Sequence, residues 1–348
     1  MTDDYRVVED GPKIIPLADD RRRGKDDGRS KLKSIDLDDF LALDIPPREM
    51  LLAPILPAKG LMMLYAFRGV GKTHVAMGMA HAVASGGTFL RWKAPVAKRV
   101  LYVDGEMPCS KIKTRMREII AGAPTKPVLP GMFKLLAADM HEGGLGNLAD
   151  RKVQGLIDGC LAGIDLVVLD NLSSLTATIR DNDSESWQTI QDWLLQLRRR
   201  GLSVLIVHHA GKQGEQRGTS RREDVLDTSI ALKRPKDYVP TEGARFEVHI
   251  EKGRGVYGDD AKPFEARLEV RYGAAHWTMR EIEDADLARV AALVDDGLSI
   301  RDIAAETGIS RSKVGRLRKR VRTEKEQMAD IFERAQARST SGAWPAQE

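Results

Sequence analysis

The stretch AFRGVGKTH, residues 66–74, carries the residue types that hold the phosphate groups of a nucleotide. It follows the apolar segment LMMLYA and precedes a helical pattern, so a strand, a glycine-rich turn and a helix are expected in that order. Glycines let backbone N–H groups close around phosphate oxygens, and the helix N-terminus adds partial positive charge. The stretch therefore predicts an ATP site, and the residues expected to bind the nucleotide are Arg68, Gly69, Val70, Gly71, Lys72, Thr73 and His74.

Two side chains of this stretch have specific expected tasks. Lys72 is expected to reach the β- and γ-phosphates, and the Thr73 hydroxyl is expected to bind Mg²⁺. The sequence departs from the pattern G-x-x-x-x-G-K-[ST] at Ala66, where the pattern has glycine, but residues 69–73 match it. The alternative is a strand-to-helix turn that carries Gly-Lys-Thr by chance.

Carboxylates follow two further apolar segments. Asp170 ends DLVVLD and is expected to hold Mg²⁺, the alternative being an aspartate that caps the strand end. Glu106 lies just past the end of RVLYVD and is the expected catalytic base, with Asp104 as its rival. The carboxyl ends of parallel strands meet at the crevice where ligands bind, so these groups are expected near the phosphates.

A pair of histidines, His208 and His209, closes the apolar segment SVLIVHH. Successive strand residues face opposite ways, so only one of the two can point at the γ-phosphate. A histidine there could hydrogen-bond the phosphate and respond to its loss. Structural histidines are the alternative, and a zinc site is disfavoured because no Cys or carboxylate lies at ligand spacing.

These motifs together resemble those of the RecA-like ATPases, which include the hexameric replicative helicases. The histidine pair with the following K…RGTS stretch resembles the plasmid-type replicative helicases of the RepA family, over about residues 40–275. The resemblance supports Glu106 as the base, and Asn171 beside Asp170 disfavours the Asp-Glu pair of AAA+ proteins. It implies Mg²⁺-dependent ATP hydrolysis, single-stranded DNA bound by the ATPase core and a homo-oligomeric, hexameric ring.

Basic residues after the histidine strand extend this resemblance. Lys252 and Arg254 are similar to the K-x-R pair that ring helicases insert into a neighbour's ATP site, where a cation stabilises charge on the transferring phosphoryl group. The alternative is a basic surface turn. Residues 211–222 match the position of the DNA-contacting loop of RecA-like proteins, with Arg217 and Arg221 as DNA contacts; Arg217 is also a competing trans-acting cation.

The last part of the chain reads as helix, helix, turn, helix. Ser299 and Ser310 are expected N-caps and Gly308 the tight turn. The pattern resembles the helix-turn-helix of resolvase-like and transcription-regulator proteins, whose second helix enters the major groove. Residues 311–322 hold seven basic and no acidic side chains. The resemblance implies contacts to duplex DNA from Arg311, Ser312, Lys313 and Arg316, the alternative being a basic helical bundle for oligomer contacts.

Short continuous apolar runs alternate with helical patterns, which predicts an α/β fold. The runs 61–66, 99–104, 133–138, 165–170 and 203–209 are expected to be buried strands of a mainly parallel sheet, as in a RecA-like P-loop core. After residue 227 the strands SIALKR, ARFEVHIEK and PFEARLEVRY lack intervening helices, so an antiparallel extension is expected. The predicted domains are a disordered arm at 1–35, an ATPase domain at 36–280 and a small all-α helix-turn-helix domain at 284–338.

Composition excludes several classes of protein. Hydrophobic residues make up 42 % of the 348, which is typical of a globular chain, and no run of about 18 apolar residues predicts a membrane span. The first 30 residues carry no secretory-signal pattern, and two cysteines form neither a disulfide framework nor a zinc site. A cytoplasmic protein without membrane contact is expected. The net charge of +4 is a weak indication of a nucleic-acid partner.

Three functions fit these observations. The leading one is an ATP-driven DNA motor, a replicative helicase of a plasmid, phage or integrated element. The second is a RecA-like ATPase that loads or remodels other proteins on DNA without unwinding it. The third is a DNA-binding regulator in which ATP is only a switch. Glu106, His208 and the K-x-R pair favour turnover over a switch.

Overall fold

A computed structural model describes residues 34–124, 128–176, 184–211, 224–235 and 237–340. The chain divides into two compact units, Met1–Pro47 and Arg48–Glu348. In the first unit the described residues form one short helix, α1 (Leu37–Leu41). The predicted disordered arm falls almost entirely outside the described residues, as do Arg217 and Arg221.

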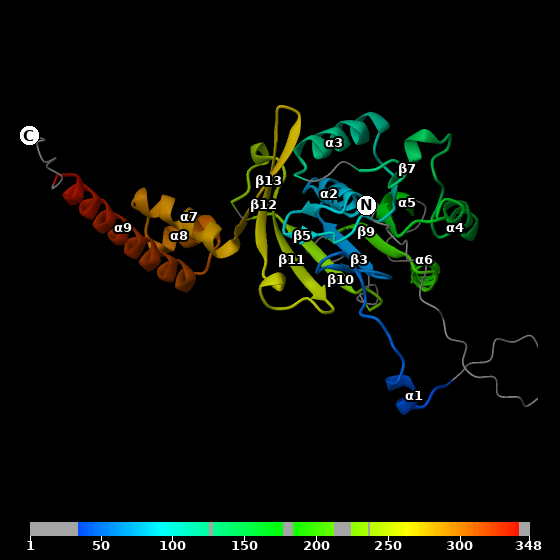
Figure 1. Ribbon diagram of the computed structural model, residues 1–348. Coiled ribbons are helices and arrows are strands. Elements are labelled where there is room, and N and C mark those ends of the chain that lie inside the picture. Colours follow the sequence, from blue (N-terminus) through cyan, green and yellow to red (C-terminus); the bar gives the residue numbers. More distant parts are fainter. Residues whose placement is uncertain (1–33, 125–127, 177–183, 212–223, 236, 341–348) are drawn as a thin grey trace, which may run out of the picture. The chain divides into compact units, whose positions relative to one another are not determined.

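The second unit is built on a nine-stranded sheet in the order β13-β12-β11-β10-β3-β9-β8-β6-β7 (Figure 1). The five strands predicted from apolar runs are present and pair in parallel: β3 (Leu61–Ala66), β6 (Val100–Asp104), β7 (Phe133–Ala137), β8 (Leu166–Asp170) and β9 (Ser203–His209). Burial is confirmed for four of them but not for β7, an edge strand in which only Ala137 is buried. The strands β11 (Arg245–Gly253) and β12 (Phe264–Arg271) form the predicted antiparallel extension, and a further strand, β13 (Ala274–Glu281), continues it.

Strand β10 (Thr228–Lys233) differs from the expectation. It pairs in parallel with β3, from Thr228 beside Met62 to Leu232 beside Ala66, and only its other edge is antiparallel, to β11. The sequence pattern had grouped it with the antiparallel extension because no helical pattern precedes it. Strand β13 was not predicted at all, although Tyr272 and Gly273, both with positive φ, make the turn that pairs it with β12.

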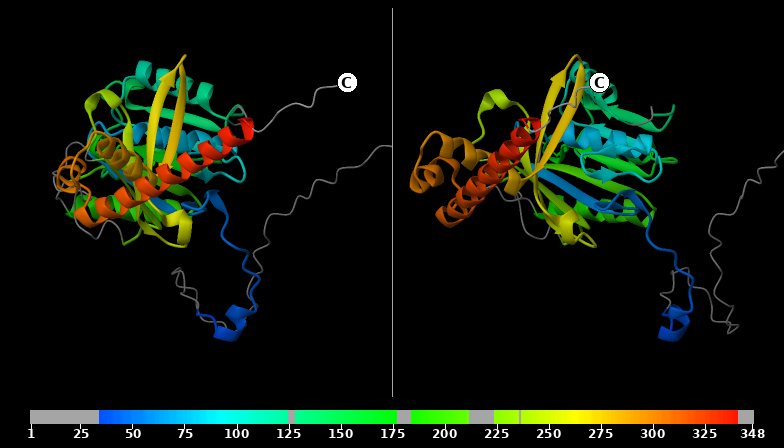
Figure 2. Two further views of the ribbon diagram at one scale, coloured as in Figure 1. Left: turned by 90° about the vertical axis from the view of Figure 1, so that its left-hand side faces the viewer. Right: turned by 60° about the vertical axis from the view of Figure 1, so that its left-hand side comes forward.

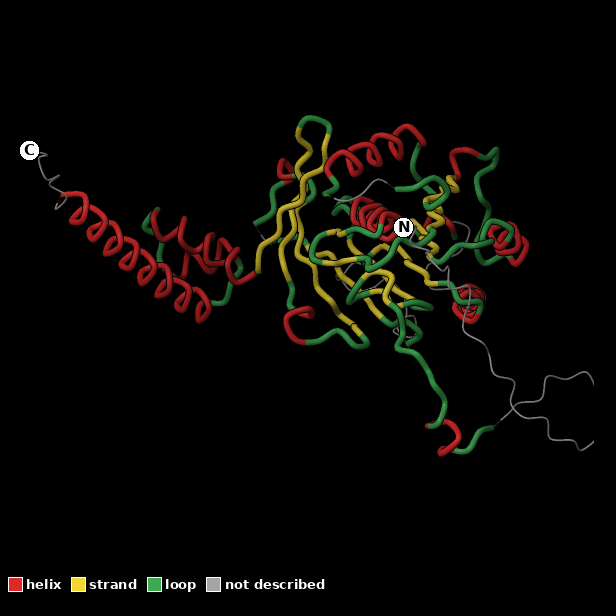
Figure 3. Tube along the Cα trace, viewed as in Figure 1, coloured by secondary structure: helices red, strands yellow, loops and turns green. Residues whose placement is uncertain are grey.

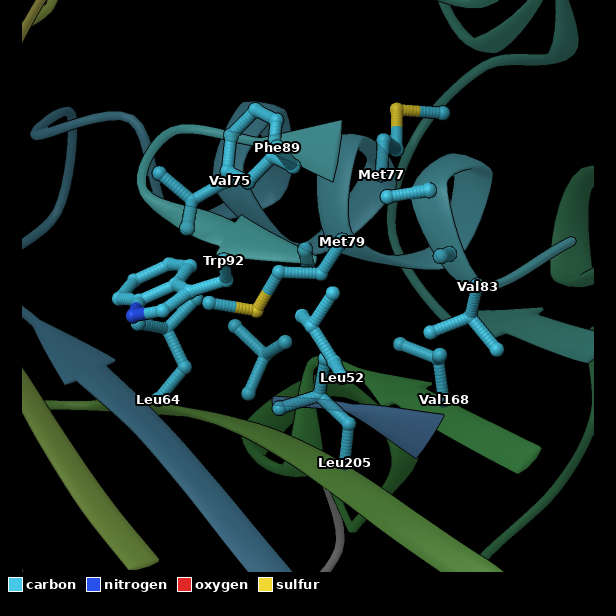
Figure 4. Close-up of a cluster of buried hydrophobic side chains, with 14 of the residues drawn as sticks. Leu52, Leu64, Val75, Met77, Met79, Val83, Phe89, Trp92, Val168 and Leu205 are labelled. Carbon is cyan, nitrogen blue, oxygen red and sulfur yellow. The ribbon is translucent and has the colours of Figure 1, made fainter. Parts of the chain in front are cut away.

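Helices cover both faces of the sheet, which explains why its central strands are continuously apolar. Along β9, Leu205 and Val207 pack in one core cluster while Val204 and Ile206 pack in the other. The first cluster lies under α2 (Lys72–Ser85) and α3 (Cys109–Gly122), with the short strands β1 (Met50–Leu52), β2 (Leu56–Pro57), β4 (Thr88–Phe89) and β5 (Trp92–Lys93); Figure 4 draws part of it. The second lies under α4 (Arg151–Asp158), α5 (Leu172–Leu175) and α6 (Ser184–Arg199).

Three helices follow the sheet: α7 (Ile282–Asp295), α8 (Ile300–Thr307) and α9 (Arg311–Thr340) (Figures 2 and 3). Ser299 caps α8 by accepting a hydrogen bond of 3.3 Å from the backbone N–H of Asp302, and Gly308 ends that helix at φ 67°. The predicted small core is present, with Ile303, Val314 and Leu317 buried. In the part of the chain that the structure describes, no helix has the length and apolar character needed to cross a membrane.

Candidate nucleotide site

A cavity of about 390 Å³ opens at the carboxyl ends of the parallel strands. Strands β3, β6, β8 and β9 each end at this edge, so residues from four distant parts of the sequence meet there. The side chains and glycines that line the cavity are Arg68, Gly69, Gly71, Lys72, Thr73, His74, Asp104, Glu106, Met107, Arg115, Asp170, Asn171, His209 and Ala244.

The glycine-rich loop has the backbone that the sequence pattern requires. Gly69 has φ 74° and Gly71 has φ 119°, conformations that a residue with a side chain rarely adopts. A Cβ on Gly71 would also lie 3.3 Å from Ala244 and from Phe246, so the loop packs closely against β11. Of the expected nucleotide-binding residues, Val70 does not line the cavity; it is 2 % exposed and packs in the core instead.

Lys72 is the first residue of α2 and is buried at the base of the cavity. Its ammonium donates to the carbonyl oxygens of Ala66 and Phe67, both at 3.1 Å, and lies 3.0 Å from His209 Nδ1. Burial lowers the pKa of Lys72 to about 8, against the opposing charges of Asp170 and Glu106. A cation held in this way is positioned to meet phosphate oxygens.

Asp170 ends β8 and is 2 % exposed. Its Oδ2 accepts a hydrogen bond of 2.6 Å from the Tyr102 hydroxyl of β6, and it also accepts one from Thr73. Burial raises the pKa of Asp170 to about 6, while these two hydrogen bonds and the charge of Lys72 act in the opposite direction. The structure thus brings together Thr73 and Asp170, the two expected Mg²⁺ ligands.

Asp104 is the last residue of β6 and Glu106 lies just beyond it, but the two side chains have different surroundings. The Asp104 Oδ1 accepts backbone hydrogen bonds from Glu106 at 3.0 Å and Met107 at 2.6 Å, so this carboxylate holds the turn. The Glu106 side chain extends into the cavity and accepts a hydrogen bond from the Asn171 amide. Burial raises the pKa of Asp104, which its two backbone hydrogen bonds partly offset. The geometry favours Glu106 as the base and gives Asp104 a positioning task.

The two histidines at the end of β9 face different surroundings, as expected from strand alternation. His209 lines the cavity and lies beside Lys72, whereas His208 is 2 % exposed and is not among the lining residues. His209 is therefore the histidine placed to meet a phosphate.

Several cationic or polar groups of the site were not identified from the sequence. Arg115 reaches the cavity from α3, and its guanidinium lies 2.9 Å from the Met107 sulfur. Arg234 donates a 3.2 Å hydrogen bond to the carbonyl oxygen of Gly69 and lies over the Tyr238 ring. His74, by contrast, was among the expected nucleotide-binding residues; burial, with the charge of Arg115, lowers its pKa to about 4, so His74 is neutral.

Lys252 and Arg254 lie away from the cavity of their own chain. Strand β11 runs antiparallel, so its end at Gly253 pairs with Thr228, at the start of β10, whereas the cavity lies at the other ends of the parallel strands. The Lys252 ammonium lies 3.4 Å and the Arg254 guanidinium 3.1 Å from the Asp224 carbonyl oxygen. Neither cation lines the nucleotide cavity of its own chain.

The four residues expected to contact duplex DNA lie at the start of α9. Arg311, Ser312 and Arg316 are exposed. Lys313 is half-buried and donates a 2.6 Å hydrogen bond to Asp286 of α7, so it is already engaged within its own helical region. Three of the four residues expected to contact DNA are therefore exposed, and the fourth, Lys313, is paired with Asp286.

The fold and the cavity define a RecA-like P-loop protein with a C-terminal helix-turn-helix. Residues 27–215 match the family model described as an AAA domain, AAA_25, and residues 283–327 match the one described as a homeodomain-like domain, HTH_23. The first match spans more than half of the chain, and the chain belongs to the AAA domain family. The closer resemblance to RepA-type helicases stays a prediction.

Two similar solved structures share 13 % sequence identity with this chain. The KaiC-like protein PH0186 from Pyrococcus horikoshii OT3 is 13 % identical, with a TM-score of 0.46 over 66 % of this chain and 93 % of that chain. The flagellar accessory protein FlaH from Methanocaldococcus jannaschii is also 13 % identical, with a TM-score of 0.46 over 64 % of this chain and 91 % of that chain. No curated protein matches this chain. Neither likeness is close enough to carry an argument.

The residues of the cavity fit Mg²⁺ and ATP chemically. Thr73 and Asp170 supply neighbouring oxygen atoms, and Lys72 and the loop N–H groups supply positive charge. No group of three His, Cys, Asp or Glu side chains able to hold a metal occurs among the described residues. Mg²⁺ commonly binds through one or two protein side chains together with phosphates and water, so two protein ligands suffice.

Proposed function

We propose that this chain hydrolyses ATP and uses it to act on DNA, as a replicative helicase of a plasmid, phage or integrated element. The observation that carries the proposal is the meeting of Lys72, Thr73, Asp170 and Glu106 in one cavity. These four groups supply a phosphate-binding cation, two metal ligands and a base, which are the parts that ATP hydrolysis requires.

Each group has a task that follows from its contacts. Thr73 and Asp170 would hold Mg²⁺, which when bound neutralises phosphate charge. Lys72 binds phosphate oxygens. Glu106, oriented by the Asn171 amide, accepts a proton from the attacking water. His209 hydrogen-bonds the terminal phosphate and, through Lys72, responds when it leaves.

Assembly into a ring would complete the site. Lys252 and Arg254 lie near the amino ends of the parallel strands, whereas the cavity of their own chain lies at the carboxyl ends. They therefore serve as the trans-acting cations of a neighbouring subunit. A cation supplied in this way stabilises charge on the transferring phosphoryl group and makes hydrolysis depend on assembly. The ring, taken to be a hexamer, binds single-stranded DNA through its core, and the helix-turn-helix binds duplex DNA.

The test combines two measurements on the full-length chain with Mg²⁺ and ATP. The motor hypothesis predicts ATP turnover that single-stranded DNA stimulates, together with displacement of a labelled strand from a forked duplex. Turnover without displacement would favour the remodelling ATPase, and binding of ATP without turnover would contradict both. The Lys72→Ala variant is the negative control for each measurement, since it removes the phosphate-binding cation.

A second candidate, a DNA-binding regulator switched by ATP, is favoured by a chain of ion pairs. The buried carboxylate of Glu265 on β12 accepts hydrogen bonds from Arg245 at 3.0 Å and from Arg289 of α7. Arg289 also bonds Asp286 at 2.9 Å, and Asp286 holds Lys313 of the DNA-binding helix. Ala244, which precedes Arg245, lines the nucleotide cavity. A slowly hydrolysed ATP analogue that changes duplex affinity would support this candidate.

A further inference from the structure

A second cavity, of about 270 Å³, lies between α2, the end of α3, β4 and β13. It shares no lining residue with the nucleotide cavity. His81 follows Lys72 by nine residues, which is about 13 Å along the helix, so the two cavities meet α2 at different levels. The residues that line the second cavity are Gly78, His81, Thr88, Phe89, Leu90, Ile119, Gly122, Ala123, Pro124, Ala275, His276, Trp277 and Met279.

The walls of this cavity are aromatic and closely packed. The rings of Phe89 and Trp277 lie 5.5 Å apart at 83°, edge to face. Glycines allow the neighbouring elements to approach: a Cβ on Gly78 would lie 2.1 Å from the Phe89 ring, and one on Gly122 would lie 1.9 Å from the Ala275 carbonyl oxygen. These close approaches bring the aromatic side chains together around the cavity. A flat ring of a ligand could stack or pack edge-on against these walls.

His81 is the buried polar side chain that lines this cavity. Its side chain is 3 % exposed and lines the cavity. Among the described residues, His81 makes no hydrogen bond or ion pair, and its ring nitrogens are not among the fully enclosed side-chain nitrogens that lack a partner, so they keep access to the cavity. Burial lowers the pKa of His81, so the ring is neutral and presents one N–H donor and one acceptor nitrogen.

The described residues that line the cavity include no Lys, Arg, Asp or Glu, so none of them would compensate a charged ligand. Aromatic walls and the buried imidazole of His81, with the exposed imidazole of His276 also in the lining, suit an uncharged planar ring system with its own donor and acceptor. We propose that this cavity is a second ligand site, which binds a neutral aromatic heterocycle through a hydrogen bond to His81 and ring contacts with Phe89 and Trp277.

Benzimidazole is a suitable probe, because it is flat and carries both a donor and an acceptor nitrogen. Binding is measured by ligand-observed NMR and calorimetry on the full-length chain, at mildly alkaline pH and with the P-loop site saturated by a slowly hydrolysed ATP analogue. Saturable binding at up to about millimolar concentration is expected, and it should persist with the analogue present. Absence of binding, or displacement by the analogue, would overturn the proposal.

Two variants locate the bound probe. His81→Leu removes the hydrogen bond and should weaken binding about tenfold or more. Ala123→Phe places a ring in the cavity mouth and should abolish binding; Ala123 has φ −73° and ψ 129°, which phenylalanine adopts freely. His141→Leu, at an exposed position outside the cavity, is the matched control and should bind as the unaltered chain does. Equal affinity in all four proteins would refute the assignment, and thermal melting checks that each is folded.

Discussion

The Lys72 ammonium lies 3.0 Å from Nδ1 of His209, which joins the start of α2 to the end of β9. The contact places one of two adjacent histidines at the nucleotide cavity and leaves the other buried in the sheet. Because Lys72 also contacts two carbonyl oxygens of the loop, a change at the phosphate can reach β9 through a single side chain.

The first prediction separates the two histidines. His209→Ala should lower kcat for ATP about tenfold to a hundredfold, since a hydrogen bond to a charged group is lost at the reacting phosphate. His208→Ala should instead lower the melting temperature, because it truncates a side chain that is 2 % exposed. Steady-state turnover and thermal unfolding of both variants distinguish these outcomes. The reverse pattern would show that His208 is the phosphate-facing residue.

The second prediction concerns the base. Glu106→Gln keeps the shape of the side chain but removes the proton acceptor, so ATP should still bind while hydrolysis slows at least about a hundredfold. Nucleotide binding is measured with a fluorescent ATP analogue and hydrolysis by phosphate release.

Asp104→Asn is the matched comparison for that experiment. Its Oδ1 accepts two backbone hydrogen bonds, which asparagine can retain, so turnover should fall less than in Glu106→Gln. If Asp104→Asn loses hydrolysis and Glu106→Gln does not, the two carboxylates have exchanged roles.

The third prediction tests whether Arg254 acts between subunits. Arg254→Ala should bind ATP normally, because Arg254 does not line the cavity of its own chain, yet hydrolyse it slowly. Mixing this variant with Glu106→Gln should restore part of the activity, since some subunit borders then pair an intact Glu106 with an intact Arg254. No recovery over a range of mixing ratios would place Arg254 in its own chain's site or outside catalysis. Lys252→Ala, examined in the same way, identifies which cation of the pair is used.

The fourth prediction concerns pH and the buried carboxylate of Glu265. Burial alone would raise its pKa, but the hydrogen bond from Arg245 and the charges of Arg245, Arg289 and Arg280 outweigh this and hold the pKa below 4.5. Stability from this carboxylate is therefore complete above pH 4.5 and is lost as pH falls through the lowered pKa.

Urea unfolding from about pH 7 to about pH 2 measures that effect, because the loss begins near the unfolded pKa and continues below it. Glu265→Gln should lower the free energy of unfolding by roughly 3 kcal/mol at neutral pH, because the buried Arg245 and the partly buried Arg289 lose their shared partner. The difference from the unaltered chain should shrink as the pH falls. Glu269→Gln, on the same strand, is the control and should change little. A difference that stays constant with pH would contradict the linkage.

The fifth prediction concerns duplex DNA. A chain ending at Glu281 keeps all of β13 and should retain nucleotide binding but lose most duplex affinity, most visibly at low salt, where phosphate contacts dominate. Within the full chain, Arg316→Ala should weaken duplex binding more than Lys313→Ala, because Lys313 is engaged by Asp286. Fluorescence anisotropy with a labelled duplex measures both, and equal duplex affinity after truncation would refute the DNA-binding assignment of the helices.

Much of the sheet could be predicted from the sequence because its central strands are buried on both faces. Segment 61–66 matches β3 residue for residue. Asp170 and Glu106 could be placed because Asp170 ends β8 and Glu106 lies just beyond β6, and both strands end on the side of the sheet where the cavity lies. Strand β10 pairs antiparallel with β11, as expected, but its parallel pairing with β3 was not foreseen, since the residues of an apolar strand do not indicate which neighbour the strand pairs with.

The missed site residues share a physical reason: their tasks depend on contacts that are distant in sequence. Tyr102 lies inside an apolar run and resembles core, yet its hydroxyl bonds Asp170, 68 positions away. Asn171 stood out only as a departure from a family pattern, whereas its amide contacts Glu106. Arg115 lies on a helix with other basic residues, and no spacing distinguishes the one that reaches the cavity. The contacts of Tyr102, Asn171 and Arg115 depend on the direction of each side chain in the folded protein, which the sequence pattern does not indicate.

The central claim is that the groups gathered at the carboxyl edge of the sheet hydrolyse ATP. Phosphate release is measured with Mg²⁺ and ATP, with and without single-stranded DNA, for the unaltered chain and for Lys72→Ala, each checked by thermal melting. The unaltered chain should turn over ATP, faster with DNA, and Lys72→Ala should be folded and inactive under both conditions. Equal turnover by the two proteins would contradict the account.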